Sequence, residues 1–235
     1  MPYISFGSNA PDMNQYGLIK DSDGEIWLAR GRERLLNEKD VPIKGEHNLM
    51  NALSALAIGE LAGLPLESML TTLKNFVGLP HRCEFITTTH QLDCFDDSKG
   101  TNIGSPIAAI LGLGKVYAPK GKKLAVILGG QGKGQNFAEL AKPLMEYAQV
   151  VYFIGEDADK IVADLASAGL DSHNSAGIVL TECQTLEQAV KQAWQDQSTF
   201  PALGVLLLSP ACASFDQFSG YVERGQVFQR LVKSQ

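Results

Sequence analysis

The chain has 235 residues, 45% of them hydrophobic and 20% charged, which is typical of a folded globular protein. Its formal net charge of -6 argues against a general nucleic-acid or anionic-lipid partner, because such partners usually require a basic face. The longest apolar runs have strand length and fall far short of the ~20 residues that cross a bilayer. The first residues lack the charged and apolar regions of a signal peptide, so we expect a cytoplasmic protein.

The first 45 residues alternate short strand-like segments with turns. Asp23-Gly24 lies between the alternating runs 16–20 and 25–30, which predicts a β-hairpin. A lone hairpin is not stable in water and needs a sheet or helix to pack against. Because no earlier residues supply one, we expect the chain to be a piece of a longer protein.

Two helices are expected next, over 48–62 and from about 65 to 76, because apolar residues recur at helical spacing and a glycine follows each run. His47, Asn48 and Asn51 lie near the start of the first helix. Their side chains could hydrogen-bond a base or a sugar. Alternatively, His47 or Asn48 simply caps the helix.

After a linker at 78–82 the pattern changes, so we place a domain boundary there and expect domains at 1–80 and 81–235. Short apolar segments now alternate with amphipathic ones, which predicts an α/β fold with a doubly wound, mostly parallel sheet. The expected strands are 83–89, 91–96, 123–128, 150–155, 177–180 and 203–209. The expected helices are 105–113, 136–147, 157–168, 185–196 and a last one after Phe215.

The carboxyl ends of parallel strands gather at one edge of a sheet, where ligands usually bind. The loops expected there are 96–102, 129–134, 155–157 and 209–214. The first loop, Asp-Asp-Ser-Lys-Gly-Thr-Asn, offers two carboxylates, an ammonium group and two hydroxyls. It is either the centre of a ligand site or a helix N-cap cluster with solvated charges.

The glycine-rich loop 129–134 is not a P-loop, because Gly134 follows its lysine and Ile127 stands where the first glycine belongs. We interpret Lys133 as a cation that meets an anionic substrate group. Ser214 is expected just before the last helix, where it could cap that helix or help bind a carboxylate. Tyr221 would line the same pocket.

The cysteines are far apart in the chain, and no CxxC pair or histidine at ligand spacing accompanies them. The sequence therefore indicates neither a disulfide framework nor a zinc site, and buried free thiols are the expected state. A catalytic thiol at Cys212 is disfavoured. The four cysteines are Cys83, Cys94, Cys183 and Cys212.

Five stretches taken together resemble the Mur ligases, the ATP-dependent amide-forming enzymes of peptidoglycan synthesis. They are GEHNLMNALSALAIGELAGLP, GLPHRCEF, DDSKGTN, LGGQGKGQNF and SPACASFDQF followed by ERG, and they occur in the family's order over about 45–235. Within the family they are most similar to the members that add D-glutamate. Two positions depart from the common pattern: Gly100 stands where alanine is frequent, and Tyr221 where phenylalanine is usual.

The resemblance implies a three-domain enzyme, of which this chain holds the end of the central ATP-binding domain and the complete Rossmann-like C-terminal domain. No GxxxxGK[ST] motif occurs in the chain, so the loop that holds the ATP phosphates is expected elsewhere. The family's carbamylated lysine and its magnesium ligands are also expected outside this chain, so no metal ligand is assigned here. By itself the chain is expected to be inactive.

The resemblance also assigns site residues. In the family, ATP converts a substrate carboxylate to an acyl phosphate, and an amine then displaces phosphate. The implied substrates are ATP with Mg²⁺, UDP-N-acetylmuramoyl-L-alanine and D-glutamate, and the enzyme is expected to be a monomer. The implied nucleotide-binding residues are Asn48, Asn51, Arg82 and Asp97. The implied D-glutamate-binding residues are Thr101, Lys133, Ser214 and Tyr221, and the implied catalytic cations are Lys99 and Lys133.

Two alternatives stay open. The chain could come from another ligase of the superfamily, such as an L-amino-acid-adding Mur ligase or folylpolyglutamate synthetase. The chain could also be a Rossmann-like binding module without catalysis of its own. The SPACASFDQF segment favours the D-glutamate-adding members over the other ligases.

Overall fold

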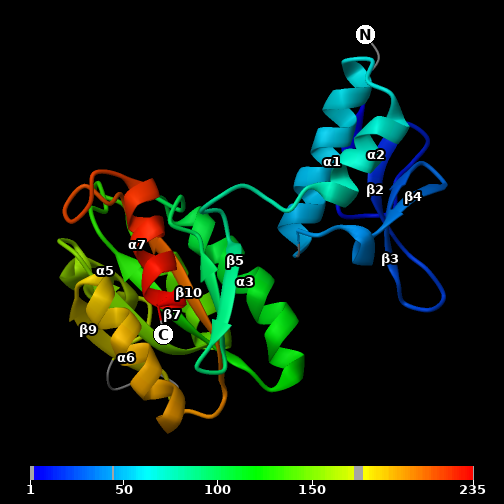
Figure 1. The fold of residues 1–235 in the computed structure, drawn as a ribbon. Coiled ribbons are helices and arrows are strands. Elements are labelled where there is room, and N and C mark those ends of the chain that lie inside the picture. Colours follow the sequence, from blue (N-terminus) through cyan, green and yellow to red (C-terminus); the bar gives the residue numbers. More distant parts are fainter. Residues whose placement is uncertain (1–2, 44, 172–176, 235) are drawn as a thin grey trace. The chain divides into compact units, whose positions relative to one another are not determined.

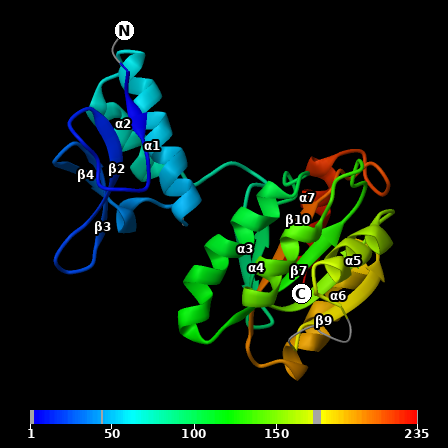
Figure 2. The same ribbon diagram turned by 180° about the vertical axis from the view of Figure 1, so that it is seen from behind.

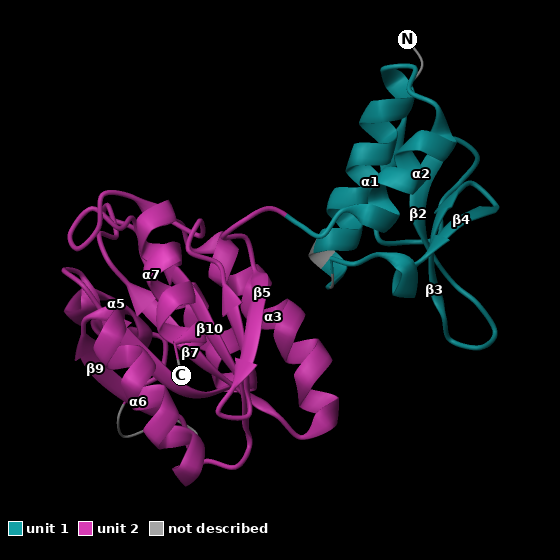
Figure 3. Cartoon of the chain, in the orientation of Figure 1, with its two compact units in different colours: residues 1–78 teal, residues 79–235 magenta. Residues whose placement is uncertain are grey.

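The computed structural model describes residues 3–43, 45–171 and 177–234, with every side chain among them except that of His47. The chain forms two compact units, residues 1–78 and 79–235 (Figure 3). Among the described residues, no helix combines the length and the apolar character needed to span a membrane.

The first unit contains a four-stranded sheet in the order β1-β2-β3-β4. The strands are β1 (Ser5–Phe6), β2 (Gln15–Lys20), β3 (Ile26–Arg30) and β4 (Glu33–Asn37), followed by a short 3-10 helix, η1 (Glu38–Asp40). β2 and β3 pair in antiparallel orientation around Asp23-Gly24, so the predicted hairpin is confirmed. Its stabilising partners are the two other strands and the helices that follow.

Helices α1 (Glu46–Leu61) and α2 (Leu66–Asn75) complete the core of this unit, in which Leu28 and Leu36 pack with Leu53 and Leu56. Both predicted helices are confirmed. The N-cap of α1 is Gly45, with φ of 99° and no side-chain cap bond. The helix starts earlier than the sequence predicts, so the interpretation of Asn48 as its cap is wrong. The side chain of His47 lies outside the described part.

The second unit is built on a six-stranded sheet in the order β5-β6-β10-β7-β8-β9. The strands are β5 (Glu84–Thr89), β6 (Leu92–Asp96), β7 (Lys123–Gly129), β8 (Ala148–Ile154), β9 (Val179–Gln184) and β10 (Leu203–Ala211). All neighbours pair in parallel except β5 and β6, which form an antiparallel hairpin. His90 and Gln91 turn this hairpin with φ of 48° and 60°, as a two-residue turn of the hairpin type requires.

Helices cover both faces of this sheet, as Figures 1 and 2 show from opposite sides. They are α3 (Gly104–Tyr117), α4 (Ala141–Tyr147), α5 (Ala158–Ser167), α6 (Leu186–Thr199) and α7 (Tyr221–Lys233), with short 3-10 helices η2 (Ala118–Lys120) and η3 (Ala138–Leu140). Val126 packs with α3, α4 and α5, whereas its neighbour Ile127 packs with α6 and α7. Because successive strand residues point to opposite faces, each strand contributes side chains to two cores, one on each face of the sheet. The predicted doubly wound fold is confirmed.

The helix predicted over 136–147 is shorter than expected, because its first part is η3 and only α4 is regular α-helix. Pro143 lies in the first turn of α4. Proline is tolerated there because the first backbone N–H groups of a helix have no partner within it, so α4 begins close to the proline.

Candidate functional site

Three loops meet at the carboxyl edge of the second unit's sheet, because β6, β10 and β7 are adjacent and parallel. The backbone N–H of Asp97 donates to the carbonyl of Leu208 at 2.7 Å. Gln131 and Ala213 exchange two backbone hydrogen bonds, both 2.9 Å long. Loops 96–102, 129–134 and 209–214 therefore share one rim, as the sequence predicts.

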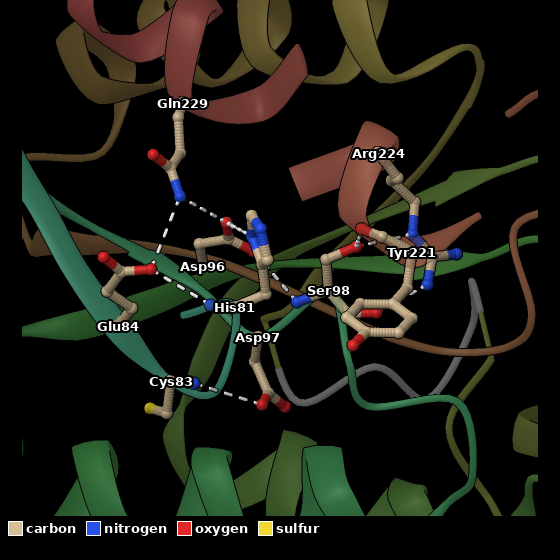
Figure 4. Close-up of polar contacts among 9 residues, drawn as sticks. All are labelled: His81, Cys83, Glu84, Asp96, Asp97, Ser98, Tyr221, Arg224 and Gln229. Carbon is tan, nitrogen blue, oxygen red and sulfur yellow. Dashed lines mark hydrogen bonds and ion pairs between the residues drawn. The ribbon is translucent and has the colours of Figure 1, made fainter. Parts of the chain in front are cut away.

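Arg224, on α7, joins these loops, and Figure 4 shows its guanidinium beside Ser98. Its guanidinium donates to the carbonyls of Ser98 at 2.8 Å, Cys212 at 3.0 Å and Gly129 at 3.5 Å, and to the hydroxyl of Ser98 at 3.0 Å. The side chain is buried, which lowers its pKa to about 10, so it stays protonated at neutral pH. One buried cation thus contacts all three loops.

The carboxylate of Asp97 points into the protein rather than into solvent. Its Oδ1 accepts from the N–H of Cys83 at 3.1 Å, and its Oδ2 accepts from the hydroxyls of Ser209 at 2.6 Å and Ser105 at 2.9 Å. Burial raises the pKa of this carboxyl, and the three hydrogen bonds oppose that shift. Asp96 is buried as well, so the two carboxylates are not solvated. The N-cap part of that alternative holds for Asn102, whose side-chain oxygen accepts from the N–H groups of Gly104 at 3.0 Å and Ser105 at 3.3 Å.

A second polar network surrounds Asp96 (Figure 4). The Nδ1 of His81 lies 2.7 Å from Oδ2 of Asp96, and the amide of Gln229 donates to Asp96 at 3.0 Å and to Glu84 at 3.4 Å. Among the described residues, His81, Glu84 and Asp96 form a set whose ligand atoms all lie within 4.8 Å of one another. Because Gln229 already donates to both carboxylates, we interpret this set as a hydrogen-bonded network rather than a metal site.

Lys99 and Tyr221 lie together where this network meets the rim. The ammonium group of Lys99 is 5.9 Å from the centroid of the Tyr221 ring, within range of a cation–π contact. Ser98 donates its hydroxyl proton to the carbonyl of Tyr221 at 2.8 Å, and the ring of His81 meets that of Tyr221 edge-on at 6.2 Å. The first loop and the start of α7 are thereby joined.

Ser214 is not where the sequence predicts it in relation to the last helix. α7 begins at Tyr221 with Gly220 at its N-cap, so the interpretation of Ser214 as a cap or helix-end anion site is wrong. The carbonyl of Ser214 accepts from the N–H of Phe218 at 2.8 Å, which closes a turn before the helix starts. Ser214 is buried at the end of its loop.

The glycines of loop 129–134 allow close backbone packing. Gly129 and Gly130 have φ of 134° and 122°, in the region that favours glycine. A Cβ on Gly129 would lie 1.8 Å from the carbonyl oxygen of Ile154, and one on Gly130 would lie 2.2 Å from that of Ala213. Any side chain at either position would collide with a neighbouring backbone.

The N–H groups of this loop are largely used inside the protein. Gln131 donates to a carbonyl, and the N–H of Gly132 donates to Oδ2 of Asp157 at 2.7 Å. The loop therefore does not offer these amides to a phosphate. Lys133 is exposed at its tip with φ of 51°, consistent with a cation presented to a ligand.

The buried thiol of Cys212 lies on the same rim, but it is unsuited to nucleophilic attack. Burial raises its pKa to about 12, so it stays protonated at neutral pH. Free buried cysteines are the predicted state, and Cys94, Cys183 and Cys212 are free and buried, whereas Cys83 is free and half-buried.

The remaining predicted residues lie in different places. Thr101 is half-buried in the first loop, and Arg82 is exposed in the linker before β5. Asn48 and Asn51 belong to the other unit, where the Asn51 amide donates to the Asn48 side-chain oxygen at 3.4 Å. The structure thus brings the predicted D-glutamate-binding residues to one rim of the second unit. Two of the predicted nucleotide-binding residues, Asn48 and Asn51, lie in the first unit instead.

Two residues of the rim, Arg224 and Gln135, were not predicted from the sequence. Arg224 precedes Phe228 and Val232 by four and eight positions, so all three lie on the buried face of α7. A cation at helical spacing with apolar residues indicates a buried charge, and the sequence offered this signal. Gln135 offered no such signal, because a glutamine in a polar loop is usually solvated.

Comparisons with known proteins point to one family. A family model for the Mur ligase glutamate ligase domain matches residues 81–212. The UDP-N-acetylmuramoylalanine–D-glutamate ligase of Psychrobacter arcticus is 54% identical over 99% of this chain and 48% of that protein. The enzyme of the same name from Acinetobacter baylyi is 49% identical over 98% of this chain and 49% of its own length. The chain therefore spans about half the length of the curated relatives it matches.

Solved structures share the fold at low sequence identity. A UDP-N-acetylmuramate-alanine ligase from Thermotoga maritima superposes with a TM-score of 0.59 at 20% identity, covering 94% of this chain and 46% of its own. A Mycobacterium tuberculosis folylpolyglutamate synthase, solved with ADP and AMPPCP, reaches 0.61 at 15% identity, covering 91% of this chain and 48% of its own. These likenesses support the fold alone.

Proposed function

The chain belongs to the Mur ligase family, and from that premise we propose that it forms part of an ATP-dependent ligase that adds D-glutamate to UDP-N-acetylmuramoyl-L-alanine. The relatives that match almost the whole chain carry the name of this activity. The proposal places the reaction in the cytoplasm, in a monomeric enzyme of peptidoglycan synthesis.

The observation that carries the proposal is the shared rim of the three loops. Lys133 extends from the glycine-rich loop after β7, while Thr101 and Ser214 lie on the loops after β6 and β10 and Tyr221 begins the adjoining helix. An ammonium group beside hydroxyls suits a small dicarboxylic amino acid, because charge-assisted hydrogen bonds are the strongest way to hold a carboxylate. We assign D-glutamate to this rim.

The proposed reaction runs in two steps. The γ-phosphoryl group of ATP passes to the carboxylate of the UDP-linked substrate, which gives an acyl phosphate and ADP. The amine of D-glutamate then attacks the acyl carbon, and phosphate leaves from the tetrahedral intermediate. Because the reacting groups are anions, the ammonium groups of Lys99 and Lys133 would mainly neutralise charge and orient the substrates.

We propose that residues 1–80 are the end of the ATP-binding domain and that 81–235 form the amino-acid-binding domain. In this proposal Asn48 and Asn51 lie on the adenine side, and Arg82 lies near the ribose and phosphates. Asp97 would affect the nucleotide through the loop it holds, because its carboxylate accepts three internal hydrogen bonds.

Mg²⁺ would accompany the ATP phosphates and lower the charge barrier to phosphoryl transfer. We assign it no ligand among the described residues, since the carboxylates of Glu84 and Asp96 already accept hydrogen bonds from Gln229. We also propose that the phosphate-binding loop lies outside this chain, which contains no GxxxxGK[ST] motif.

A substrate panel tests the proposal in the complete ligase. The enzyme is incubated with ATP, UDP-N-acetylmuramoyl-L-alanine and one amino acid at a time: D-glutamate, L-lysine or meso-diaminopimelate. Phosphate release and product mass are measured. We expect turnover with D-glutamate only. Turnover with meso-diaminopimelate or L-lysine instead would assign the chain to another Mur ligase, and no turnover with any of the three amino acids would contradict the proposal.

A further inference from the structure

Gln135 lies just after the tip of the glycine-rich loop, and its carboxamide contacts three separate segments. Its Nε2 donates to the carbonyl of Gly132 at 2.9 Å and to that of Ala211 at 3.2 Å. Its Oε1 accepts from the N–H of Ile103 at 3.1 Å. One half-buried side chain thus uses both of its N–H groups and an oxygen lone pair on backbone partners.

These backbone partners stand close in the chain to the residues of the proposed D-glutamate site. In chain order, they lie two residues after Thr101, one before Lys133 and three before Ser214. The carboxamide therefore binds backbone atoms of two of the loops and of Ile103, which directly follows the third. The carboxamide thus adds a side-chain link near all three proposed substrate-binding residues, beside the contacts of Arg224 and the direct backbone hydrogen bonds between loops.

The orientation of this carboxamide is determined by its neighbours. Turned over, its oxygen would face the carbonyls of Gly132 and Ala211, and its NH₂ group would face the N–H of Ile103. Each contact would then be repulsive. A glutamate at this position would keep the acceptor for Ile103 but would have no donor for the two carbonyls.

We propose that Gln135 is a positioning residue that sets the distances among the three loops at the D-glutamate site. This inference rests on the proposed function of that rim. Gln135 binds backbone atoms rather than substrate, and it acts through the placement of Thr101, Lys133 and Ser214. Because small displacements of binding groups weaken affinity steeply, loss of the carboxamide should affect one substrate selectively.

The test uses the complete ligase and the variants Gln135→Met and Gln135→Glu. Methionine keeps the length of the side chain and removes all three hydrogen bonds. The matched control is Gln149→Met, because the Gln149 amide donates at 2.9 Å to Gly177, and Gln149 lies near the amino end of β8, away from the rim. KM is measured separately for D-glutamate, ATP and the UDP-linked substrate, together with the midpoint of thermal unfolding.

We expect both Gln135 variants to raise the KM for D-glutamate about tenfold or more, with the other two KM values within about twofold of wild type. The Gln149 variant should match wild type throughout. An unchanged KM for D-glutamate would overturn the inference. So would a parallel rise of all three KM values with a lower unfolding midpoint in both variants, since that indicates general destabilisation.

A second measurement separates this inference from the proposed function. Hydrogen exchange of the Ile103 amide, followed by NMR in the 235-residue chain, reports on the carboxamide without any substrate. Exchange should accelerate in Gln135→Met and stay slow in Gln135→Glu, which keeps the acceptor. If the wild-type ligase does not use D-glutamate, the proposed function fails. If exchange is the same in all variants, the positioning role fails.

Discussion

Arg224 stabilises the rim by donating to backbone oxygens of all three loops. Replacing it with methionine would leave the buried carbonyls of Ser98 and Cys212 without their donor. We expect Arg224→Met to lower the free energy of unfolding by roughly 2–4 kcal/mol. Urea unfolding of the 235-residue chain measures this, with Arg230→Met on the exposed side of the same helix as control. Equal losses in the two variants would show that Arg224 does not hold the loops.

The buried carboxyl of Asp97 should make stability depend on pH. Because burial raises its pKa, Asp97 favours the folded state at low pH, and this contribution is lost as pH rises through the folded-state pKa. In the variant Asp97→Asn the side chain would not titrate, and its amide could donate to the hydroxyl of Ser105 or Ser209. The stability of Asp97→Asn relative to wild type should therefore increase from pH 4.5 to pH 7.5.

Urea unfolding at the two pH values measures this difference, and Asp159→Asn on the surface of α5 is the control. A constant difference between wild type and Asp97→Asn would contradict the buried-carboxylate account.

For single residues, the sequence predicted which side chains belong to the site better than it predicted their hydrogen-bond partners. Lys99, Tyr221 and Lys133 were predicted as site residues, and they do lie on the rim or at its edge. The inward orientation of Asp97 depends on Ser209, which is 112 positions away in the chain. Local patterns do not report such long-range hydrogen bonds.

At the scale of elements, α7 packs closely on the polar network because it has a glycine there. A Cβ on Gly225 would lie 2.2 Å from Nδ1 of His81 and 2.8 Å from Oδ2 of Asp96. Alanine normally stabilises a helix relative to glycine by roughly 0.5–1 kcal/mol. Here we expect Gly225→Ala to destabilise the chain by about 1–3 kcal/mol, because the helix must move outward.

Urea unfolding tests this, with Gly7→Ala as the control. At Gly7 an added Cβ has nothing within 4 Å. If Gly225→Ala is as stable as the control or more so, the close packing of α7 on His81 does not contribute to the free energy of unfolding.

The elements were mostly predictable because their hydrophobic periods are strong. Continuous apolar runs identified β7, β8 and β10, and glycines marked the ends of α1 and α2. Element starts were less predictable. Residues 215–220 form turns before α7, and the bond that closes them, from Phe218 to Ser214, is not visible in a pattern of apolar residues.

At the scale of the whole molecule, the two units have separate cores, and the second carries the rim. The proposed activity needs an ATP-phosphate loop, and the 235 residues contain no GxxxxGK[ST] motif. We therefore expect the purified chain alone to release no phosphate from ATP above the buffer blank in a coupled assay. The complete ligase, run in parallel with its substrates, is the positive control. Sustained ATP hydrolysis by the chain would contradict the proposal that the ATP-phosphate loop lies outside it.

Replacing Lys133 shows whether the shared rim binds D-glutamate. A cation facing a desolvated carboxylate contributes roughly 1.5–3 kcal/mol, which corresponds to about 12- to 140-fold in binding. In the complete ligase, Lys133→Ala should raise the KM for D-glutamate by that factor and leave the KM for ATP near wild type, while Lys191→Ala on α6 changes neither. An unchanged KM for D-glutamate in Lys133→Ala would contradict binding of D-glutamate at this rim.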